Sequence, residues 1–161
     1  MSSKPTNVVV AGLGGQGVLK ASDILADVAF SAGLDVKKSE VHGMSQRGGS
    51  VCSDVRFGER VFSPMVPEGE ADFLLVIAAD QVEVNRAALG KSGILIEPTQ
   101  IDESSLANKK SLNVALLGVL SCHLQFPAEA WTAALERNLP EKLHEANRQA
   151  FSIGRAIGQG K

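Results

Sequence analysis

The chain has 161 residues, of which 44% are hydrophobic and 21% charged, the composition of an ordinary globular protein with one core. Sixteen basic and eighteen acidic side chains give a formal net charge of −2, and no lysine or arginine cluster forms a footprint for a nucleic-acid backbone. Cys52 and Cys122 stand apart, so four-cysteine ligation of an iron–sulfur cluster cannot come from this chain. We expect one domain over residues 1–161, ordered over about 7–158, without a nucleic-acid partner.

The sequence shows no targeting or membrane-spanning segment. Residues 1–6 have no apolar run behind a basic region, and the longest apolar stretch, residues 114–120, is far too short to cross a bilayer. We therefore expect a cytoplasmic protein that does not bind a membrane.

The first predicted elements are a strand, a glycine-rich loop and the start of a helix. Residues 8–11 are an apolar run, and residues 12–17 read Gly-Leu-Gly-Gly-Gln-Gly. Gly12, Gly14 and Gly17 fit the pattern GxGxxG, in which glycines allow positive φ and a close approach to a ligand, and helix amides point at an anion. The same glycines could serve only a tight strand-to-helix turn, and the pattern alone favours neither function.

A second strand and a second glycine-rich loop follow the first helix. Apolar residues recur at helical spacing over 18–32, and Gly33 ends that helix as a C′ glycine. Residues 34–41 are a strand candidate, so the chain begins with a strand–helix–strand unit of a parallel sheet. Residues 42–50 contain three glycines and no periodicity, which predicts a loop. If the two strands are adjacent and parallel, both loops lie at one sheet edge.

Alternation of apolar and polar residues over 51–57, a turn at residues 58–59 and the short run 60–63 predict a β-hairpin, which makes the sheet mixed. Gly90 and Gly93 punctuate the elements that follow. Those elements are a strand at 73–79, a helix at about 80–89, a strand at 94–97, a polar surface segment at 98–110, and helices at 112–124, 131–139 and 143–157. The predicted class is α/β, a three-layer α/β/α fold with a mixed, mainly parallel sheet, a Rossmann-like start and a helical C-terminus.

Few side chains are placed for catalysis. The three histidines, His42, His123 and His144, have no spacing typical of metal ligands, and no GxSxG segment offers a serine nucleophile. We predict no catalytic residue and no metal ligand in this chain.

Arg47 is the most informative charged residue. It is flanked by Gly48 and Gly49, so its backbone can come close to a ligand, and its guanidinium suits a carboxylate or phosphate bound through two hydrogen bonds. A salt bridge across a subunit interface would use the same residue equally well. For an NAD enzyme, Asp35 or Glu40 could hold the ribose hydroxyls at the second strand, although Gly15 and Gln16 make the fingerprint imperfect.

Five motifs follow one another along the chain: Gly12-Leu-Gly-Gly-Gln-Gly17, Glu40-Val-His-Gly-Met-Ser-Gln-Arg-Gly-Gly49, Phe62-Ser-Pro, Pro67-Glu-Gly-Glu-Ala-Asp72 and Asn113-Val-Ala-Leu-Leu-Gly118. Together they resemble the gamma domain of the 2-oxoacid:ferredoxin oxidoreductases, and their residues are most similar to the beta subunit of the indolepyruvate branch. The resemblance runs from about Asn7 to the last helix.

The resemblance implies a domain of a larger complex that converts a 2-oxoacid (indolepyruvate, pyruvate or ketoisovalerate type) and coenzyme A to an acyl-CoA and passes electrons to ferredoxin. Thiamine diphosphate, Mg and the iron–sulfur clusters would then be held by other, larger subunits, and none by this chain alone. The isolated chain would be inactive and would self-associate through the surface left uncovered. The candidate cofactor-binding residues, for a phosphate of coenzyme A, are Gly12, Gly14, Gly15, Gln16, Gly17, Arg47, Gly48 and Gly49.

Two alternatives stay open beside this interpretation: a stand-alone NAD(P)- or nucleotide-binding protein, and a scaffold subunit whose glycine loops serve only assembly. The chain also departs from the indolepyruvate branch, because it is shorter than expected between Leu89 and Asn113. The sequence does not give the 2-oxoacid.

Overall fold

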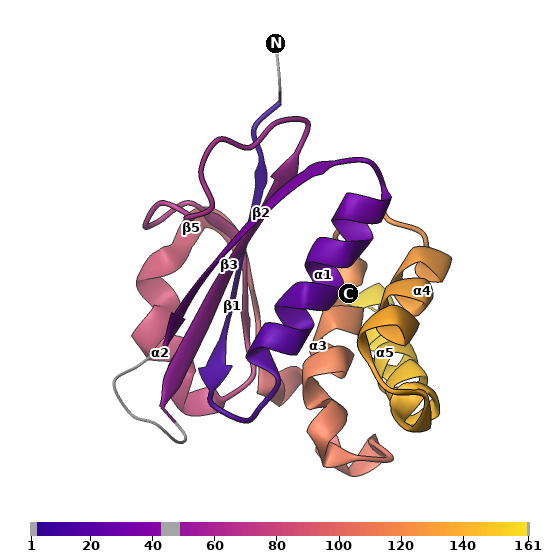
Figure 1. Ribbon diagram of the computed structural model, residues 1–161. Coiled ribbons are helices and arrows are strands. Elements are labelled where there is room, and N and C mark those ends of the chain that lie inside the picture. Colours follow the sequence, from indigo (N-terminus) through magenta and orange to yellow (C-terminus); the bar gives the residue numbers. More distant parts are fainter. Residues whose placement is uncertain (1–2, 43–48, 161) are drawn as a thin grey trace.

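The fold is built on a five-stranded mixed sheet in the order β2-β3-β1-β4-β5 (Figure 1). It was obtained as a computed structural model, which describes residues 3–42 and 49–160, the side chain of His42 excepted. The strands are β1 (Thr6–Leu13), β2 (Asp35–His42), β3 (Ser50–Gly58), β4 (Ala71–Val76) and β5 (Leu89–Ile96). β1 pairs in parallel with β4 and β4 with β5, whereas β3 is antiparallel to both β1 and β2. The predicted α/β class with a mixed sheet is confirmed.

Four helices lie on one side of the sheet, and a shorter helical segment lies on the other side (Figure 1). Two of the four lie against the sheet, α1 (Val18–Ser31) and α3 (Leu112–Ser121), and two are packed on the outside of these, α4 (Ala128–Asn138) and α5 (His144–Gln159). The shorter segment is α2 (Val82–Asn85) with a 3₁₀ turn on each side. The 3₁₀ turns of the described chain are Ala79–Gln81, Arg86–Ala88, Pro98–Gln100, Glu103–Ser105, Lys109–Ser111 and Glu141–Leu143. None of the described helices combines the length and the apolar character needed to cross a membrane.

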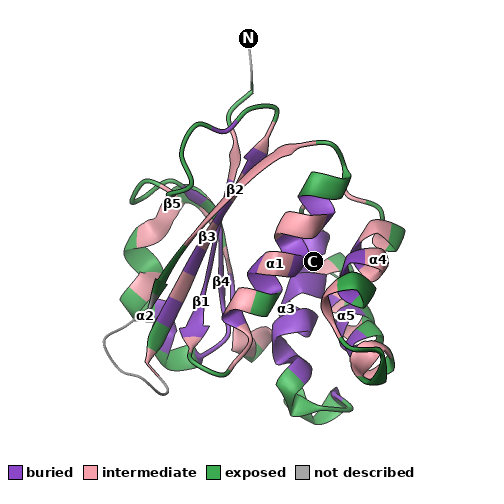
Figure 2. Cartoon of the chain, viewed as in Figure 1, coloured by how far each residue is buried: buried purple, intermediate pink, exposed green. Residues whose placement is uncertain are grey.

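The main core lies between the four helices and the sheet. α3 is at its centre and is buried along its whole length, which is why its sequence is apolar nearly all round (Figure 2). α3 and α5 cross at Gly118 and Gly154, where a Cβ atom on Gly154 would collide with the carbonyl oxygen of Ala115. The two glycines therefore allow a backbone-to-backbone approach that larger residues would prevent. A smaller cluster around Leu74 and Val82 fills the other face.

The predicted adjacency of the first two strands is wrong. β3 lies between β1 and β2 and is antiparallel to both, so β1 and β2 run in the same direction but do not touch. Their carboxyl ends still lie at one edge, because Gly12 is opposite Val51 and Val51 is opposite His42. The two glycine-rich loops therefore start from the same edge of the sheet, as expected, with one strand between them.

The predicted hairpin between residues 51–57 and 60–63 is also wrong, because β3 forms its hairpin with β2 instead. Residues 60–66 form an ordered loop held by side chains of the sheet. The amide of Val61 donates to Asp35 Oδ2 (2.8 Å), and the amide of Val66 donates to Asp54 Oδ2 (2.9 Å). Nη1 of Arg56 donates to the carbonyl oxygen of Ser63 (2.9 Å). These bonds occupy backbone groups that a strand would use for a ladder.

The last strand is longer than predicted. β5 begins at Leu89, so Gly90 and Gly93 lie inside it rather than bounding it, next to a register irregularity opposite Ala71 and Phe73. A Cβ atom on Gly93 would lie 2.7 Å from the carbonyl oxygen of Ala71, closer than real Cβ contacts come. These glycines therefore permit a bulge rather than end an element.

Candidate functional site

The first glycine loop connects β1 to α1 in a conformation that two of its glycines require. Gly15 has φ = 89° and Gly17 has φ = 82°, both in the left-handed region. A Cβ atom on Gly15 would meet open space, so only its backbone conformation favours glycine there. A Cβ atom on Gly17 would also collide with Nδ2 of Asn113. Gly17 is therefore the most constrained position of the loop.

Gln16 closes the loop from inside. Its Oε1 accepts a hydrogen bond from the amide of Leu13 (2.8 Å), and a Cβ atom on Gly12 would lie 2.9 Å from the same oxygen. The side chain thus holds the end of β1 against the turn. The expected donation of the Gln16 amide to an anion stays a prediction, but its carbonyl oxygen already has a structural role.

Asn113, at the start of α3, supports the loop from the core side. Its Nδ2 donates to the carbonyl oxygen of Gly17 (3.1 Å), which also accepts the amide of Ala21 in α1 (2.9 Å). Asn113 is 6% exposed, so this amide is shielded from solvent. The sequence placed Asn113 in a motif but gave no reason to connect it with a loop 96 positions away.

The start of α1 is suited to an anion. The amide of Ala21 is the first of those near the start of α1 that bonds the carbonyl oxygen four residues back, which leaves the amides of the first turn without that bond. No acidic residue occupies this turn and no side chain caps it. A cavity of about 280 Å³ opens here, between Gly14, Gly15 and Lys20. The start of α1 and Lys20 therefore border this cavity, together with the apolar residues Leu13, Val18, Leu19 and Val51.

The second glycine loop touches the first through backbone atoms. The amide of Gly14 donates to the carbonyl oxygen of Gly49 (2.8 Å), next to the pairing of Leu13 with Ser50. The structure therefore brings the candidate residues Gly12, Gly14, Gly15, Gln16, Gly17 and Gly49 together. Arg47 and Gly48 lie outside the described residues, and the convergence of the Arg47 guanidinium on this site stays a prediction.

A second cavity lies on the other side of the glycine loop. It has a volume of about 230 Å³ and is lined by Gly15, Gln16, Ile77, Glu103, Lys109, Lys110 and Leu112, so two ammonium groups and one carboxylate border it. β1 continues into α1 on one face of the sheet, whereas β4 continues toward α2 on the other face (Figure 1). The space between the carboxyl ends of β1 and β4 is therefore the point where α/β sheets place ligands. Sequence reasoning missed the two lysines, because they lie in a polar segment without a motif.

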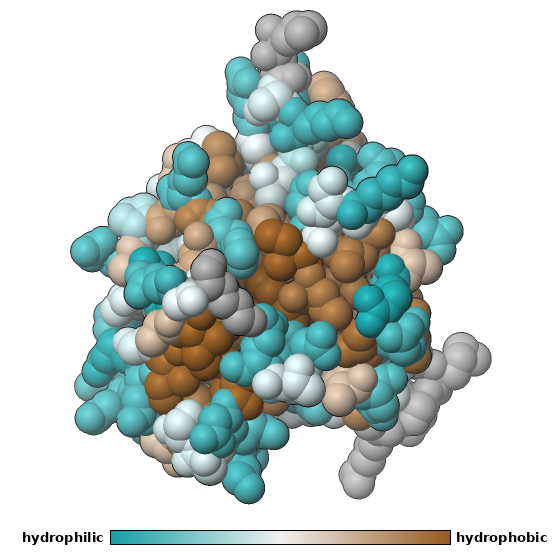
Figure 3. All heavy atoms as spheres, turned by 180° about the vertical axis from the view of Figure 1, so that it is seen from behind, coloured by the Kyte–Doolittle hydropathy of each residue, from teal (hydrophilic) through white to brown (hydrophobic). Residues whose placement is uncertain are grey.

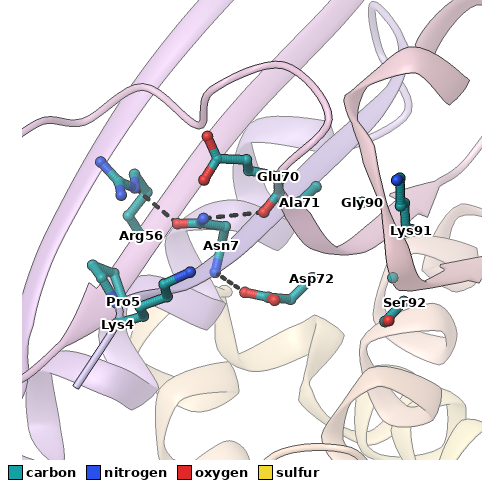
Figure 4. A pocket seen from close by; sticks show the side chains of 11 residues that line it. Lys4, Pro5, Asn7, Arg56, Glu70, Ala71, Asp72, Gly90, Lys91 and Ser92 are labelled. Carbon is teal, nitrogen blue, oxygen red and sulfur yellow. Dashed lines mark hydrogen bonds between the residues drawn. The ribbon is translucent and has the colours of Figure 1, made fainter.

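The opposite edge of the sheet carries a larger polar cavity of about 420 Å³ (Figure 4). Asn7 lies at its base and uses all its groups internally: its amide donates to Asp72 Oδ2 (2.8 Å), Nδ2 to the carbonyl oxygen of Glu70 (3.1 Å), and Oδ1 accepts from Arg56 Nε (2.8 Å). These bonds tie the start of β1 to β3 and to the start of β4. The arrangement is that of a structural network.

Among the described residues, the Cys52 thiol and the acidic side chains form neither a thiolate nucleophile nor a metal site. Burial raises the pKa of Cys52 to about 12, and the charge of Asp54 adds to this effect, so the thiol is not a thiolate nucleophile near neutral pH. Over residues 3–42 and 49–160, no three His, Cys, Asp or Glu side chains gather in a way that could hold a metal ion.

Comparisons with known proteins agree with these motifs. The family model for pyruvate ferredoxin/flavodoxin oxidoreductase matches residues 7–157. Indolepyruvate oxidoreductase subunit IorB of Thermococcus kodakarensis is 35% identical over 193 aligned positions, covering 94% of this chain and 95% of that protein. The alignment is longer than this chain, so that relative has residues that this chain lacks. Ketoisovalerate oxidoreductase subunit VorA of Methanothermobacter marburgensis is 33% identical over 74% of this chain and 25% of that protein.

Two solved structures share the fold. The gamma subunit of a keto/oxoacid ferredoxin oxidoreductase from Geobacter sulfurreducens superposes with a TM-score of 0.80 at 23% identity, covering 97% of this chain and 99% of that one. The second is the 2-oxoglutarate:ferredoxin oxidoreductase of Magnetococcus marinus, solved with 2-oxoglutarate, coenzyme A and succinyl-CoA bound. It superposes with a TM-score of 0.83 at 18% identity, covering 99% of this chain and 32% of that one. With the family model spanning nearly its whole length, this chain belongs to the pyruvate ferredoxin/flavodoxin oxidoreductase family.

Proposed function

We propose that this chain is the gamma-type subunit of a 2-oxoacid:ferredoxin oxidoreductase, a complex that converts a 2-oxoacid and coenzyme A to an acyl-CoA and passes electrons to ferredoxin. The observation that carries the proposal is the match to an indolepyruvate oxidoreductase subunit over 94% of this chain and 95% of that relative. A match that covers nearly the whole of both proteins supports a separate subunit, whereas the VorA match covers only a quarter of a longer protein. The indolepyruvate type is therefore the first substrate class to test, before the pyruvate and ketoisovalerate types.

In this proposal, the larger partner subunits hold thiamine diphosphate, Mg and the iron–sulfur clusters, and ferredoxin is the acceptor. The role of this chain is to bind and orient an anionic part of the substrates. The first turn of α1 and Lys20 border the cavity on one side of the glycine loop, and Lys109 and Lys110, with Glu103, border the cavity on the other. Phosphate groups are the ligands that such a combination of helix amides and ammonium groups favours.

A phosphate of coenzyme A is the anion that this reaction supplies. Gly15 and Gly17, both in the left-handed region, leave the backbone between the two cavities without side chains. A phosphate can therefore approach the amides closely. Asn113 and Gln16 hold the loop in this conformation before a ligand arrives. Such preorganisation lowers the entropic cost of binding.

Contact with a larger partner is supported by the loop 60–66. Phe62 is 82% exposed and Met65 is 59% exposed, although three side chains of the sheet fix the backbone beside them. An exposed aromatic residue on a fixed loop can enter a partner's apolar pocket at little entropic cost. The opposite side of the molecule from Figure 1 also exposes apolar areas between hydrophilic side chains (Figure 3).

A stand-alone NAD(P)-binding protein is the second candidate, and the strand order argues against it. A dinucleotide fold places the ribose carboxylate on the strand next to β1, whereas β3 separates β2 from β1 here. Asp35 lies at the amino end of β2, where it binds the amide of Val61, and Glu40 pairs with Lys38. Titration of the chain with NAD and NADP tests this candidate, because micromolar affinity for either would favour it.

Copurification tests the proposal itself. The tagged chain, expressed in its native cell and purified under anaerobic conditions, is expected to retain a large subunit with thiamine diphosphate and iron–sulfur clusters. Recovery of the chain alone, or with proteins that carry neither group, would count against the proposal.

A further inference from the structure

β2 is an edge strand with a regular, uncovered outer side. It pairs with β3 over all eight residues from Asp35 to His42 and is the terminal strand of the sheet that residues 3–42 and 49–160 form. In the part of the chain that the structure describes, no loop or helix forms a backbone-to-backbone hydrogen bond with β2. A row of unpaired amide and carbonyl groups of this length is a template for another strand.

The side chains of β2 restrict which strand can pair there. Lys38 and Glu40 lie on the face of α1, where Nζ of Lys38 is 3.2 Å from Oε1 of Glu40 and also contacts Asp23. Val41 lies on the opposite face and is 59% exposed. Charges on an edge strand usually prevent pairing, because like charges then face each other.

A second copy of β2 is a partner that can avoid this repulsion, in only one of the registers that pair five or more residues of the strand. In an antiparallel pair related by a two-fold axis, residues directly opposite each other lie on the same face of the sheet. The axis therefore passes midway between the two copies of one residue, which face each other. An axis at Lys37, Lys38 or Glu40 places like charges opposite each other. An axis at Ser39 places Lys38 opposite Glu40 of the other copy, twice, and Lys37 opposite Val41.

The surface beside β2 also suits a second copy. A groove of about 500 Å³ runs between α1 and β2, lined by Asp23, Ala26, Phe30, Val36 and Lys38, among others. Phe30 is 72% exposed at this groove. A two-fold contact would therefore bring an exposed aromatic ring and an open groove of each copy to the same interface, the self-complementary arrangement that such symmetry requires.

We propose that two copies of this chain associate through β2, antiparallel about Ser39, to form one continuous ten-stranded sheet with two reciprocal pairs between Lys38 and Glu40. The dimer leaves the glycine loop of each copy on its own sheet edge. It requires neither a ligand nor the partner subunits of the proposed complex.

Sedimentation equilibrium of the purified chain and of charge variants tests the proposal. Glu40→Lys replaces both opposite-charge pairs by like-charge pairs and is expected to raise the dimer dissociation constant about tenfold or more. Lys38→Glu combined with Glu40→Lys restores opposite charges and is expected to return most of that affinity. Lys37→Glu is the matched control. It also reverses one charge of β2, but on the other face and opposite Val41, and it is expected to have a small effect on the dimer dissociation constant.

Disulfide trapping tests the register without relying on affinity. Opposite Cα atoms in an antiparallel pair are about 4.5–5.5 Å apart, within reach of a disulfide. Ser39→Cys is expected to form a disulfide-linked dimer under mild oxidation, whereas Lys37→Cys and the unaltered chain are not. A chain that is monomeric at about 100 μM overturns the proposal. A dimer that Ser39→Cys does not trap, and that Glu40→Lys does not weaken, also overturns it.

Discussion

Nδ2 of Asn113 donates a hydrogen bond to the carbonyl oxygen of Gly17 over 3.1 Å, joining the start of α3 to the start of α1. The space that this side chain occupies is the space that a Cβ atom on Gly17 would need. The conformation of the glycine loop is therefore fixed jointly by its own backbone and by a buried amide from the core.

Alanine substitutions separate these two causes. Gly15→Ala adds only the cost of a left-handed non-glycine residue, and we expect a loss of about 1–2 kcal/mol in the free energy of unfolding. Gly17→Ala adds a collision with Asn113 and is expected to cost more than Gly15→Ala. Urea denaturation of the two variants measures the difference, and equal losses would show that Asn113 does not constrain Gly17.

Arg47→Ala tests whether the two glycine loops form one anion site. Loss of a charge-assisted contact of about 1.5–3 kcal/mol should weaken coenzyme A binding roughly ten- to a hundredfold in the assembled enzyme. The Michaelis constant for the 2-oxoacid should change much less, because in the proposed complex the 2-oxoacid reacts on thiamine diphosphate held by a larger subunit. If Arg47→Ala leaves the Michaelis constant for coenzyme A unchanged and the complex dissociates on a sizing column, Arg47 is an interface residue instead.

Phe62→Ser tests the docking loop. Phe62 is 82% exposed, so its loss should leave the fold intact, while affinity for the large subunit should fall about thirtyfold, as for an aromatic anchor of about 2 kcal/mol. Val84→Ser is a matched control, because Val84 is an exposed apolar residue (64%) of α2, outside this loop. Surface plasmon resonance measures both affinities. Equal effects of the two substitutions would contradict a specific role of the loop.

The lowered pKa of Asp27 predicts that the free energy of unfolding decreases at acid pH. The hydrogen bonds from Arg137, and then from Asn138 and Ser31, lower the pKa of this carboxyl from its ordinary 3.8, although partial burial opposes them. A lowered pKa in the folded state means that the stabilisation is present above the unfolded value and is lost as pH falls through the folded one. The ion pair between Asp27 and Arg137 joins α1 to α4 near the surface. We therefore expect it to contribute about 1 kcal/mol or less to the free energy of unfolding.

Denaturation of the unaltered chain and Asp27→Asn across this range is the measurement. The unaltered chain should be more stable near neutral pH, and the difference should shrink below pH 3.8. A difference that stays constant through this range would assign the contribution of Asp27 to packing rather than charge.

The fold class could be predicted from the sequence, because periodicity reports which faces are buried. The partner of β3 could not. Gly58 and Glu59 suggest a turn, but Asp35, Asp54 and Arg56 bind the backbone of residues 61–66 and keep it out of the sheet. Local patterns do not contain such contacts between distant side chains.

The candidate site could be predicted only in part, again because local patterns do not contain contacts between residues far apart in the sequence. The glycines of the first loop are a local signal, since left-handed backbone favours glycine wherever it occurs. Asn113, Lys109 and Lys110 reach the loop only because α3 begins beside it, which is a property of the tertiary fold. No pattern within the loop could have indicated them.

Reconstitution tests the central claim most directly. This chain and the large subunit are purified separately, and reduction of ferredoxin by a 2-oxoacid and coenzyme A is measured for each alone and for the mixture. We predict no activity from this chain alone and strong coenzyme A-dependent activity from the mixture, with an arylpyruvate tested first. Activity of this chain by itself, or equal activity of the large subunit with and without it, would contradict the account.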